Sequence, residues 1–194
     1  MRRLCVFCGS SVGHRPEYRS AARQLGELLA QRGIVLVFGA GHIGLMGVLA
    51  DAVLERGGEA IGVIPQALVD KELAHRKLTA LHVVGTMHQR KALMADLADG
   101  FVALPGGFGT ADELFEILTW AQLGLHTKPV GLLNTAGFFD PLLAWVDHCV
   151  GEGFVRPEHR ELLRISSNSD ELLEMLLRYK SSPALPKWLD ASER

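Results

Sequence analysis

The sequence predicts an α/β fold, a doubly wound parallel sheet with helices on both faces. Short apolar runs alternate with longer amphipathic runs along nearly the whole chain. Strands of a parallel sheet are buried on both faces, so they are continuously apolar, as these runs are. The length of 194 residues allows one domain with a sizeable core. We expect that single domain to span residues 1–180, with residues 181–194 as a peripheral tail.

The first half of the chain contains four of the expected strands. They are residues 4–8, 34–38, 59–64 and 81–84. Expected helices lie over about 16–32, 48–56 and 87–97. Pro16 stands near the start of the first helix and Gly33 ends it, as is typical of helix termini. Residues 66–77 are polar and charged, which predicts a short helix or a loop.

The second half continues the alternation after a central strand at residues 101–104. We expect, in order, a helix over 110–123, a strand over 129–133, a helix over 139–152 and a short edge strand over 164–166. Asp170 is placed at the N-cap or in the first turn of a final helix that reaches about Tyr179.

Composition argues against two classes of partner. The chain is 48% hydrophobic and 22% charged, with a formal net charge of −2 and no block of lysines and arginines. A protein that binds nucleic acid or a membrane surface needs a concentrated positive face, so we expect neither. The longest apolar stretch, residues 34–50, contains His42 and four glycines and is short for a membrane span.

The N-terminal residues bear on the cellular location of the protein. The first residues lack the apolar core and cleavage site of a secretory signal, so we expect a cytoplasmic location.

Three cysteines are an odd number, which implies no disulfide framework. Cys5 and Cys8 form a C-x-x-C pair, but residues three apart on a strand point to opposite faces. We therefore expect buried thiols rather than a metal or redox pair. The eight histidines show no paired metal-ligand spacing.

The central strand leads into a glycine corner, Pro105-Gly106-Gly107-Phe108-Gly109, and an amphipathic run begins at Thr110. Glycines let backbone N–H groups approach a ligand, and a helix N-terminus offers unpaired donors. We therefore expect a phosphate here. Asp112, Glu113 and Glu116 stand just inside the helix, where acids are usually only partners of the helix dipole. The alternative is that one of them faces the reacting part of the ligand.

A second glycine loop follows the strand at 34–38. Gly39-Ala40-Gly41-His42-Ile43-Gly44 matches the G-x-G-x-x-G fingerprint of dinucleotide sites. That fingerprint needs an acid at the end of the next strand to hold the ribose, but here the strand runs into Pro65 and Gln66. We therefore favour a mononucleotide, or close helix–strand packing, over an NAD-linked oxidoreductase.

Arg90 and Lys91 leave two interpretations open. Both are solvated surface charges, or Arg90 turns into a cleft and binds a phosphate or carboxylate. Ligands of open parallel sheets lie outside the carboxyl ends of the strands. That edge collects Gly9 and Ser10, the loop over 39–47, Arg90 and the glycine corner, which predicts one shared site.

Two motifs form a pair: Met87-His88-Gln89-Arg90-Lys91, and the glycine corner with Thr110 and Glu113. Residues 8–11, 44–47, 119–124 and 128–134 extend the pattern. Together they resemble the Lonely Guy family of cytokinin riboside 5′-monophosphate phosphoribohydrolases over roughly residues 3–150. Ala40 stands where family members often carry a glycine. Many relatives bear the label "lysine decarboxylase", which we discount because no pattern here marks a pyridoxal phosphate lysine.

The resemblance implies a Rossmann-like fold, a homodimer, and hydrolysis of the N-glycosidic bond of AMP or an N6-prenylated AMP, with no metal or redox cofactor. It matches Arg90 and Glu113 to the two residues regarded as catalytic. The positions that we expect to contact substrate are Gly9, Ser10, Glu72, Arg90, Lys91, Gly106, Gly107, Phe108, Gly109, Thr110, Ala111, Asp112, Glu113 and Thr119. Met87 and Met94 are candidates for lining the base pocket.

Glu113 is expected to be ionised at neutral pH, because Arg90 and the helix N-terminus both favour the carboxylate. In that form it stabilises positive charge on the ribose and positions water, with only modest basicity. The rival function is a non-catalytic nucleotide or cofactor carrier on the same fold.

Overall fold

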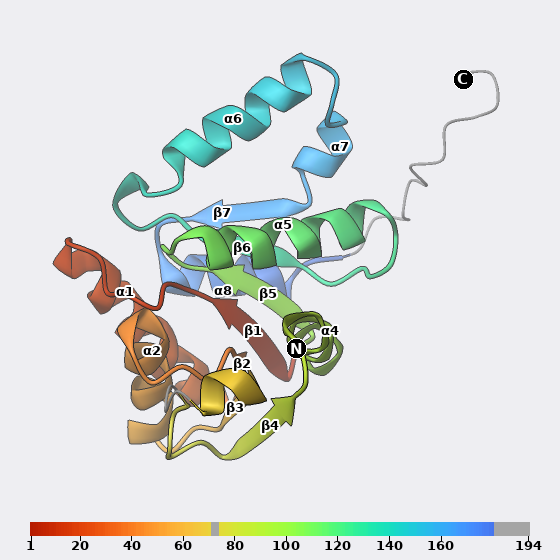
Figure 1. Ribbon diagram of the computed structural model, residues 1–194. Coiled ribbons are helices and arrows are strands. Elements are labelled where there is room, and N and C mark those ends of the chain that lie inside the picture. Colours follow the sequence, from red (N-terminus) through yellow and green to blue (C-terminus); the bar gives the residue numbers. More distant parts are fainter. Residues whose placement is uncertain (71–73, 181–194) are drawn as a thin grey trace.

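The computed structural model describes residues 1–70 and 74–180, which are built around one seven-stranded sheet (Figure 1). Its strand pairs are all parallel, in the order β4-β3-β2-β1-β5-β6-β7. The strands are β1 (Arg3–Phe7), β2 (Val35–Phe38), β3 (Ala60–Pro65), β4 (Ala80–Val84), β5 (Gly100–Ala103), β6 (Val130–Leu133) and β7 (Leu163–Ser166). The predicted α/β fold with a parallel sheet is confirmed.

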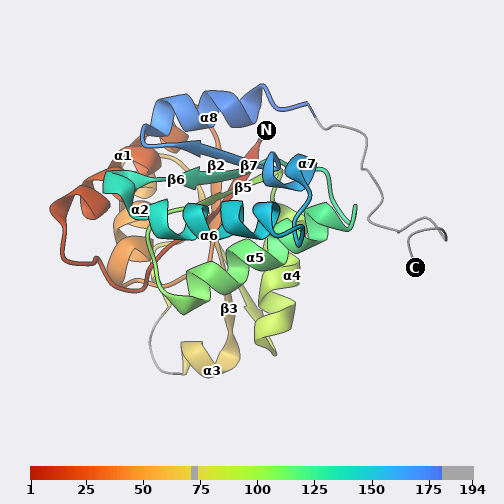
Figure 2. The ribbon, with the colours of Figure 1, turned by 90° about the horizontal axis from the view of Figure 1, so that it is seen from above.

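Helices cover both faces of this sheet (Figure 2). One face carries α1 (Pro16–Gln31), α2 (Gly44–Glu55) and α8 (Ser169–Leu177). The other carries α4 (Met87–Leu97), α5 (Phe108–Gln122) and α6 (Asp140–Gly151). Three shorter turns, α3 (Gln66–Val69), η1 (Thr135–Gly137) and α7 (Pro157–Arg160), complete the described helices.

Two apolar clusters hold the layers together, one on each face of the sheet. Leu29 of α1 and Leu49 of α2 are fully buried in the first cluster, and Met94 of α4 is buried in the second. Removing such side chains from water is the main favourable contribution to folding. Cys8, directly after β1, belongs to the first cluster and Cys5 of β1 to the second, so the two thiols lie on opposite faces of the sheet as predicted.

Two helices begin earlier than expected because glycines are accommodated in their first turns. The N–H of Gly47 donates to the Ile43 carbonyl at 3.2 Å, so α2 already begins at Gly44. At α5 the N–H of Ala111 donates to the Gly107 carbonyl at 3.1 Å.

The C-terminal helix α8 contains Asp170 in its first turn, one of the two expected positions. Asn168 is its N-cap, because the Asn168 side chain accepts the Glu171 N–H at 3.1 Å. The structure therefore selects the first-turn alternative for Asp170. The expected tail over 181–194 lies outside the described residues.

The strand order reverses direction at β1, whose neighbours are β2 on one side and β5 on the other. In open α/β sheets the crevice outside the carboxyl ends of the strands at this point is where ligands bind. The loops after β1, β2 and β5 meet there. Among the residues that the structure describes, no helix combines the length and the apolar character needed to cross a membrane.

Candidate active site

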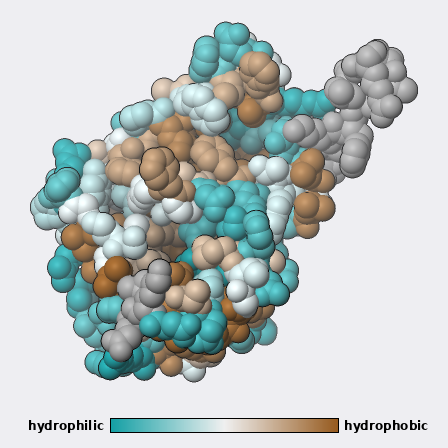
Figure 3. All heavy atoms as spheres, viewed as in Figure 1, coloured by the Kyte–Doolittle hydropathy of each residue, from teal (hydrophilic) through white to brown (hydrophobic). Residues whose placement is uncertain are grey.

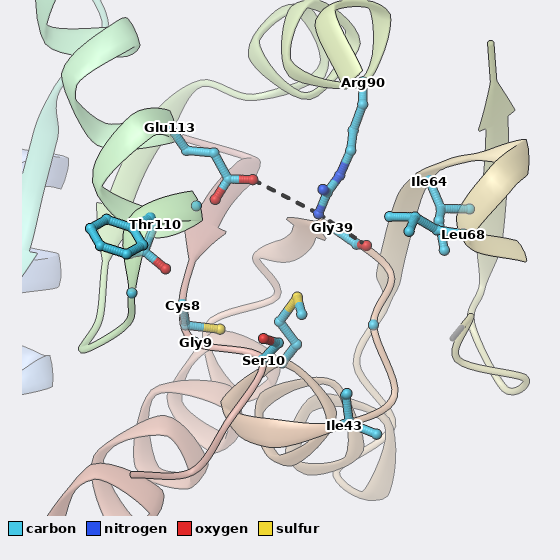
Figure 4. Close-up of a pocket in the computed structure, with 15 residues that line it drawn as sticks. Cys8, Gly9, Ser10, Gly39, Ile43, Ile64, Leu68, Arg90, Thr110 and Glu113 are labelled. Atoms are coloured by element: carbon cyan, nitrogen blue, oxygen red, sulfur yellow. Dashed lines mark hydrogen bonds and ion pairs between the residues drawn. The ribbon is translucent and has the colours of Figure 1, made fainter. Parts of the chain in front are cut away.

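A cavity of about 360 Å³ opens at the carboxyl ends of β1, β2 and β5 (Figure 4). Gly9 and Ser10, the loop between β2 and α2, and the N-terminus of α5 form its wall. Arg90 of α4 and Glu113 of α5 point into it and toward one another (Figure 4). The structure therefore brings together the groups that strand direction places at one edge of the sheet.

The glycine corner presents bare backbone to the cavity. Gly107 is the N-cap of α5, and no side chain caps this helix. A side chain at Gly106 would collide with the Thr110 side chain, whereas one at Gly107 or Gly109 would meet no atom within 4 Å. The packing of the chain therefore does not require glycine at these two positions. Their bare backbone leaves the positive end of the helix open to an anion such as phosphate.

Arg90 turns away from solvent and is 8% exposed. A capping box fixes the start of α4: the Thr86 hydroxyl accepts the Gln89 N–H at 3.1 Å, and the Gln89 side chain accepts the Thr86 N–H at 3.2 Å. Arg90 follows directly and donates from Nε to the Val63 carbonyl and from Nη2 to the Gly39 carbonyl, each at 3.2 Å. Of the two interpretations of Arg90, the structure agrees with the one in which it enters the cleft.

Glu113 faces Arg90 across the cavity, with Oε1 3.8 Å from Nη2 and the side chain 11% exposed. Burial raises the pKa of Glu113 from 4.5 to about 7, although the Arg90 charge opposes this. The expectation of a carboxyl with an ordinary pKa, fully ionised at neutral pH, is therefore wrong. Desolvation outweighs the arginine because the ion pair is long and the guanidinium is shared with two carbonyls. A carboxyl that titrates near neutrality can both accept and donate a proton.

Lys91 connects α4 to α5 beside the cavity. Its Nζ lies 3.0 Å from the Asp112 carboxylate and 3.1 Å from the Glu116 carboxylate. These two acids therefore have a cationic partner, which offsets their repulsion of an anion at the helix N-terminus. This arrangement supports a structural role for Asp112 and Glu116 rather than a reacting one.

The floor of the cavity carries no reactive thiol. Cys8 lines it (Figure 4), and burial together with the Glu113 charge raises the pKa of the Cys8 thiol well above its usual range. A thiol in that state is a poor nucleophile at neutral pH. Within residues 1–70 and 74–180, no three His, Cys, Asp or Glu side chains gather to form a metal site.

An apolar wall completes the cavity on the side away from Glu113 (Figure 4). It consists of Ile43, Met46, Ile64 and Leu68. Sequence analysis did not single out these residues, although the position of Ile64 near the carboxyl end of β3 was a signal for that one. Met94 is buried in the core instead of lining the cavity, and the exposed Met87 accepts an N–H from Arg90 Nη1 at 3.7 Å.

The remaining expected contact positions lie elsewhere. Lys91, Gly106, Ala111 and Asp112 adjoin lining residues in the chain without lining the cavity themselves. Thr119 lies farther along α5, where its hydroxyl donates to the Phe115 carbonyl at 2.7 Å and borders a separate groove between α5 and α6. Glu72 lies outside the described residues.

Known proteins match most of the chain. A family model described as "Possible lysine decarboxylase" matches residues 46–176. The chain is 50% identical to the probable cytokinin riboside 5′-monophosphate phosphoribohydrolase LOGL5 of Oryza sativa subsp. japonica, over 94% of this chain and 74% of that protein. It is 49% identical to the cytokinin riboside 5′-monophosphate phosphoribohydrolase LOG2 of Arabidopsis thaliana, over 92% of this chain and 84% of that protein.

Solved structures share the fold at lower identity. The molybdenum cofactor binding protein of Rippkaea orientalis is 21% identical with a TM-score of 0.69, over 91% of this chain and 96% of that one. The molybdenum cofactor carrier protein of Chlamydomonas reinhardtii is 20% identical with a TM-score of 0.68, over 91% and 98%. These likenesses show the fold alone. The family match and the identity to the two plant proteins show that the chain belongs to the Lonely Guy family.

Proposed function

We propose that this chain hydrolyses the N-glycosidic bond of AMP or an N6-substituted AMP and releases the base and ribose 5-phosphate. The observation that carries the proposal is the position of Glu113. Its buried carboxyl shares one cavity with Arg90 and with the N-terminus of the helix from which it projects. The names of the plant relatives, phosphoribohydrolases of cytokinin riboside 5′-monophosphates, support the same reaction.

The glycine corner is the proposed site of the 5′-phosphate. Gly107 and Gly109 leave open space in front of a helix N-terminus that lacks a side-chain cap. Phosphate binding there is remote from the bond that breaks, so its binding energy serves to fix the ribose against Glu113. A phosphate held at one end and a carboxyl at the other define the orientation of the sugar.

Glu113 is the proposed acid–base group. Cleavage of the N-glycosidic bond builds positive charge on the ribose, which the ionised carboxyl stabilises. The carboxylate takes a proton from the attacking water, whose oxygen bonds to C1′, and the base leaves with the electrons of the broken bond. Glu113 then donates its proton to the base. A pKa of about 7 fits both steps at neutral pH. Arg90 keeps the ionised form accessible because its charge opposes the effect of burial.

The base is proposed to lie against the apolar wall. Ile43, Met46, Ile64 and Leu68 offer van der Waals contact and no side-chain hydrogen bond to an N6 substituent. An alkyl group on N6 is therefore accepted rather than excluded. Because one methylene in an apolar pocket contributes roughly 1–3 kcal/mol, we expect N6-isopentenyl-AMP to have a KM at least about tenfold below that of AMP.

Product analysis separates hydrolysis from carriage. The protein is incubated with AMP or isopentenyl-AMP, and the mixture is separated by chromatography. Hydrolysis predicts free base and ribose 5-phosphate in equal amounts. A carrier, as the Chlamydomonas reinhardtii neighbour is named, predicts that bound nucleotide is recovered intact. Intact nucleotide after incubation with folded protein would refute the proposal.

A homodimer through the groove between α5 and α6 is also part of the proposal. Apolar side chains gather between these helices (Figure 3), where Trp145 is 56% exposed and stacks edge-on with Phe115 at 5.7 Å. The resemblance matches Thr119 to a nucleotide-contacting position. In this chain Thr119 borders the groove and does not line the candidate active-site cavity. In the proposed dimer a second copy occupies this groove, and Thr119 contacts the nucleotide that the partner binds.

The cytoplasm is the proposed location. Cys5 and Cys8 are free thiols in the core, and Cys149 is also unpaired. Such thiols suit a reducing compartment. Cell fractionation with an antibody to the chain tests this placement.

A further inference from the structure

Gly39, the first residue after β2, lies where the Arg90 guanidinium reaches the sheet (Figure 4). Its carbonyl accepts the Nη2–H of Arg90, and the Val63 carbonyl of β3 accepts the Nε–H. A Cβ added to Gly39 would overlap Nη2 and would lie 2.8 Å from Cζ. The three nearest atoms to that Cβ all belong to Arg90. The guanidinium therefore fills the space that a side chain at this position needs.

The backbone itself does not demand glycine at this position. Gly39 is absent from the residues with positive φ, whereas Gly44 has a φ of 64°. The next residue, Ala40, has a φ of 60° and still carries a side chain. Positive φ is the usual reason for a glycine in a loop, and it does not apply here. The lack of a side chain at Gly39 is explained by Arg90 and not by the turn.

The two carbonyls hold Arg90 away from Glu113. A closed, charge-assisted hydrogen bond between guanidinium and carboxylate is about 2.8 Å long. Here Nη2 and Oε1 are 3.8 Å apart. An open pair leaves the Glu113 carboxyl able to exchange its proton and leaves Arg90 donors available to a ligand.

We propose that Gly39 is a positioning residue, whose missing side chain lets the Arg90 guanidinium lie against β2 and so keeps the Arg90–Glu113 pair open across the cavity. A methyl group at position 39 displaces the guanidinium. Val63 and Met87 already contact it on other sides. The free direction is into the cavity, where Glu113 is the one acid among the described lining residues. The displaced cation therefore closes onto Glu113.

The groups around Glu113 fix the sign of the expected change. Burial is the strongest influence on the pKa of Glu113 and raises it. The charged or titratable neighbours are Arg90 and Lys91 on α4, Asp112 and Glu116 on α5, Cys5 on β1 and Cys8 directly after β1. Gly39→Ala moves only Arg90 among these. A closer cation favours the carboxylate, so the pKa of Glu113 falls.

Carbon-13 NMR of protein labelled at the glutamate δ carbon measures this pKa without any turnover. The Glu113 signal is identified by its loss in Glu113→Gln. We expect Gly39→Ala to lower the apparent pKa of Glu113 by about one unit. We also expect kcat to fall at least about tenfold with little change in KM, because the carboxyl becomes a weaker base. An unchanged pKa overturns the proposal.

The NMR result separates this proposal from the proposed function on which it rests. If Gly39→Ala shifts the pKa of Glu113 but the wild type hydrolyses no nucleotide, the role of Gly39 in placing Arg90 is supported. In that case only the proposed hydrolysis is refuted. Gly151→Ala in α6, where an added Cβ meets no atom within 4 Å, is the matched glycine control. It is expected to leave the pKa of Glu113 and kcat unchanged.

Arg90→Lys supplies the background that isolates the steric link. A lysine has no atom at the position of Nη2, so Gly39→Ala meets no guanidinium there. We expect Gly39→Ala to alter the pKa of Glu113 in the wild type and to have no effect in the Arg90→Lys background. If Gly39→Ala prevents folding alone, recovery of folding with Arg90→Lys supports the proposal. Equal effects in both backgrounds, including failure to fold in both, overturn it.

Discussion

Replacing Glu113 with glutamine is expected to stabilise the folded protein above neutral pH and to have no effect at acid pH. Burial raises the pKa of this carboxyl from 4.5 to about 7 in the folded state. Between these pH values the folded state keeps a proton that the unfolded chain releases. Below pH 4.5 both states are protonated and the wild type has no penalty relative to the variant. As the pH rises to about 7 the wild type becomes less stable than the variant.

The magnitude follows from the size of the pKa shift. Each pKa unit corresponds to about 1.4 kcal/mol, so the full penalty at high pH is about 3 kcal/mol. Urea unfolding of wild type and Glu113→Gln at one protein concentration, at pH 8 and at pH 4, measures the difference. We expect the variant to be more stable by about 2–3 kcal/mol at the higher pH and equal at the lower. The exposed carboxyl of Glu152 provides the control Glu152→Gln, for which no such difference is expected. Equal stability of wild type and Glu113→Gln at pH 8 contradicts the reasoning.

Three other changes test separate parts of the site. Gly109→Ala puts a methyl group into the open space of the glycine corner. We therefore expect the KM for AMP to rise at least about tenfold with no loss of thermal stability. The control Gly151→Ala is expected to leave the KM unchanged. Lys91→Met removes a charge that lowers the pKa of Glu113, so the acid limb of kcat/KM should move to higher pH; a shift to lower pH is the opposing result. Trp145→Glu puts a charge on the apolar groove and is expected to convert dimers to monomers in analytical ultracentrifugation. A wild type that is already monomeric refutes the dimer proposal.

Most of the sheet could be predicted from the sequence because its central strands, such as β1 and β5, are buried on both faces, whereas the edge strand β4 is largely exposed. Continuous apolar runs such as residues 101–104 therefore identify strands without any knowledge of their partners. Helix α4 was placed at its observed bounds, which a local capping box fixes. The turns η1 and α7 were not predicted, because each has only three or four residues and no apolar repeat.

The location of the candidate site could be predicted, but its electrostatics could not. Strand direction alone places Arg90 and the glycine corner at one edge of the sheet. The pKa of Glu113 depends instead on burial by segments far apart in the chain. It also depends on the Gly39 and Val63 carbonyls, which hold the guanidinium back. Most of the apolar wall was missed for a similar reason, since Met46 and Leu68 reach the cavity only through the tertiary fold.

The most direct test of the central claim is a single-turnover measurement of base release from isopentenyl-AMP by wild type and Glu113→Gln. Nucleotide affinity is measured alongside by isothermal titration calorimetry. We expect the variant to bind the nucleotide with near wild-type affinity and to release the base at least about a hundredfold more slowly, the usual scale for a positioned acid–base group. Base release at the wild-type rate by folded Glu113→Gln contradicts the account.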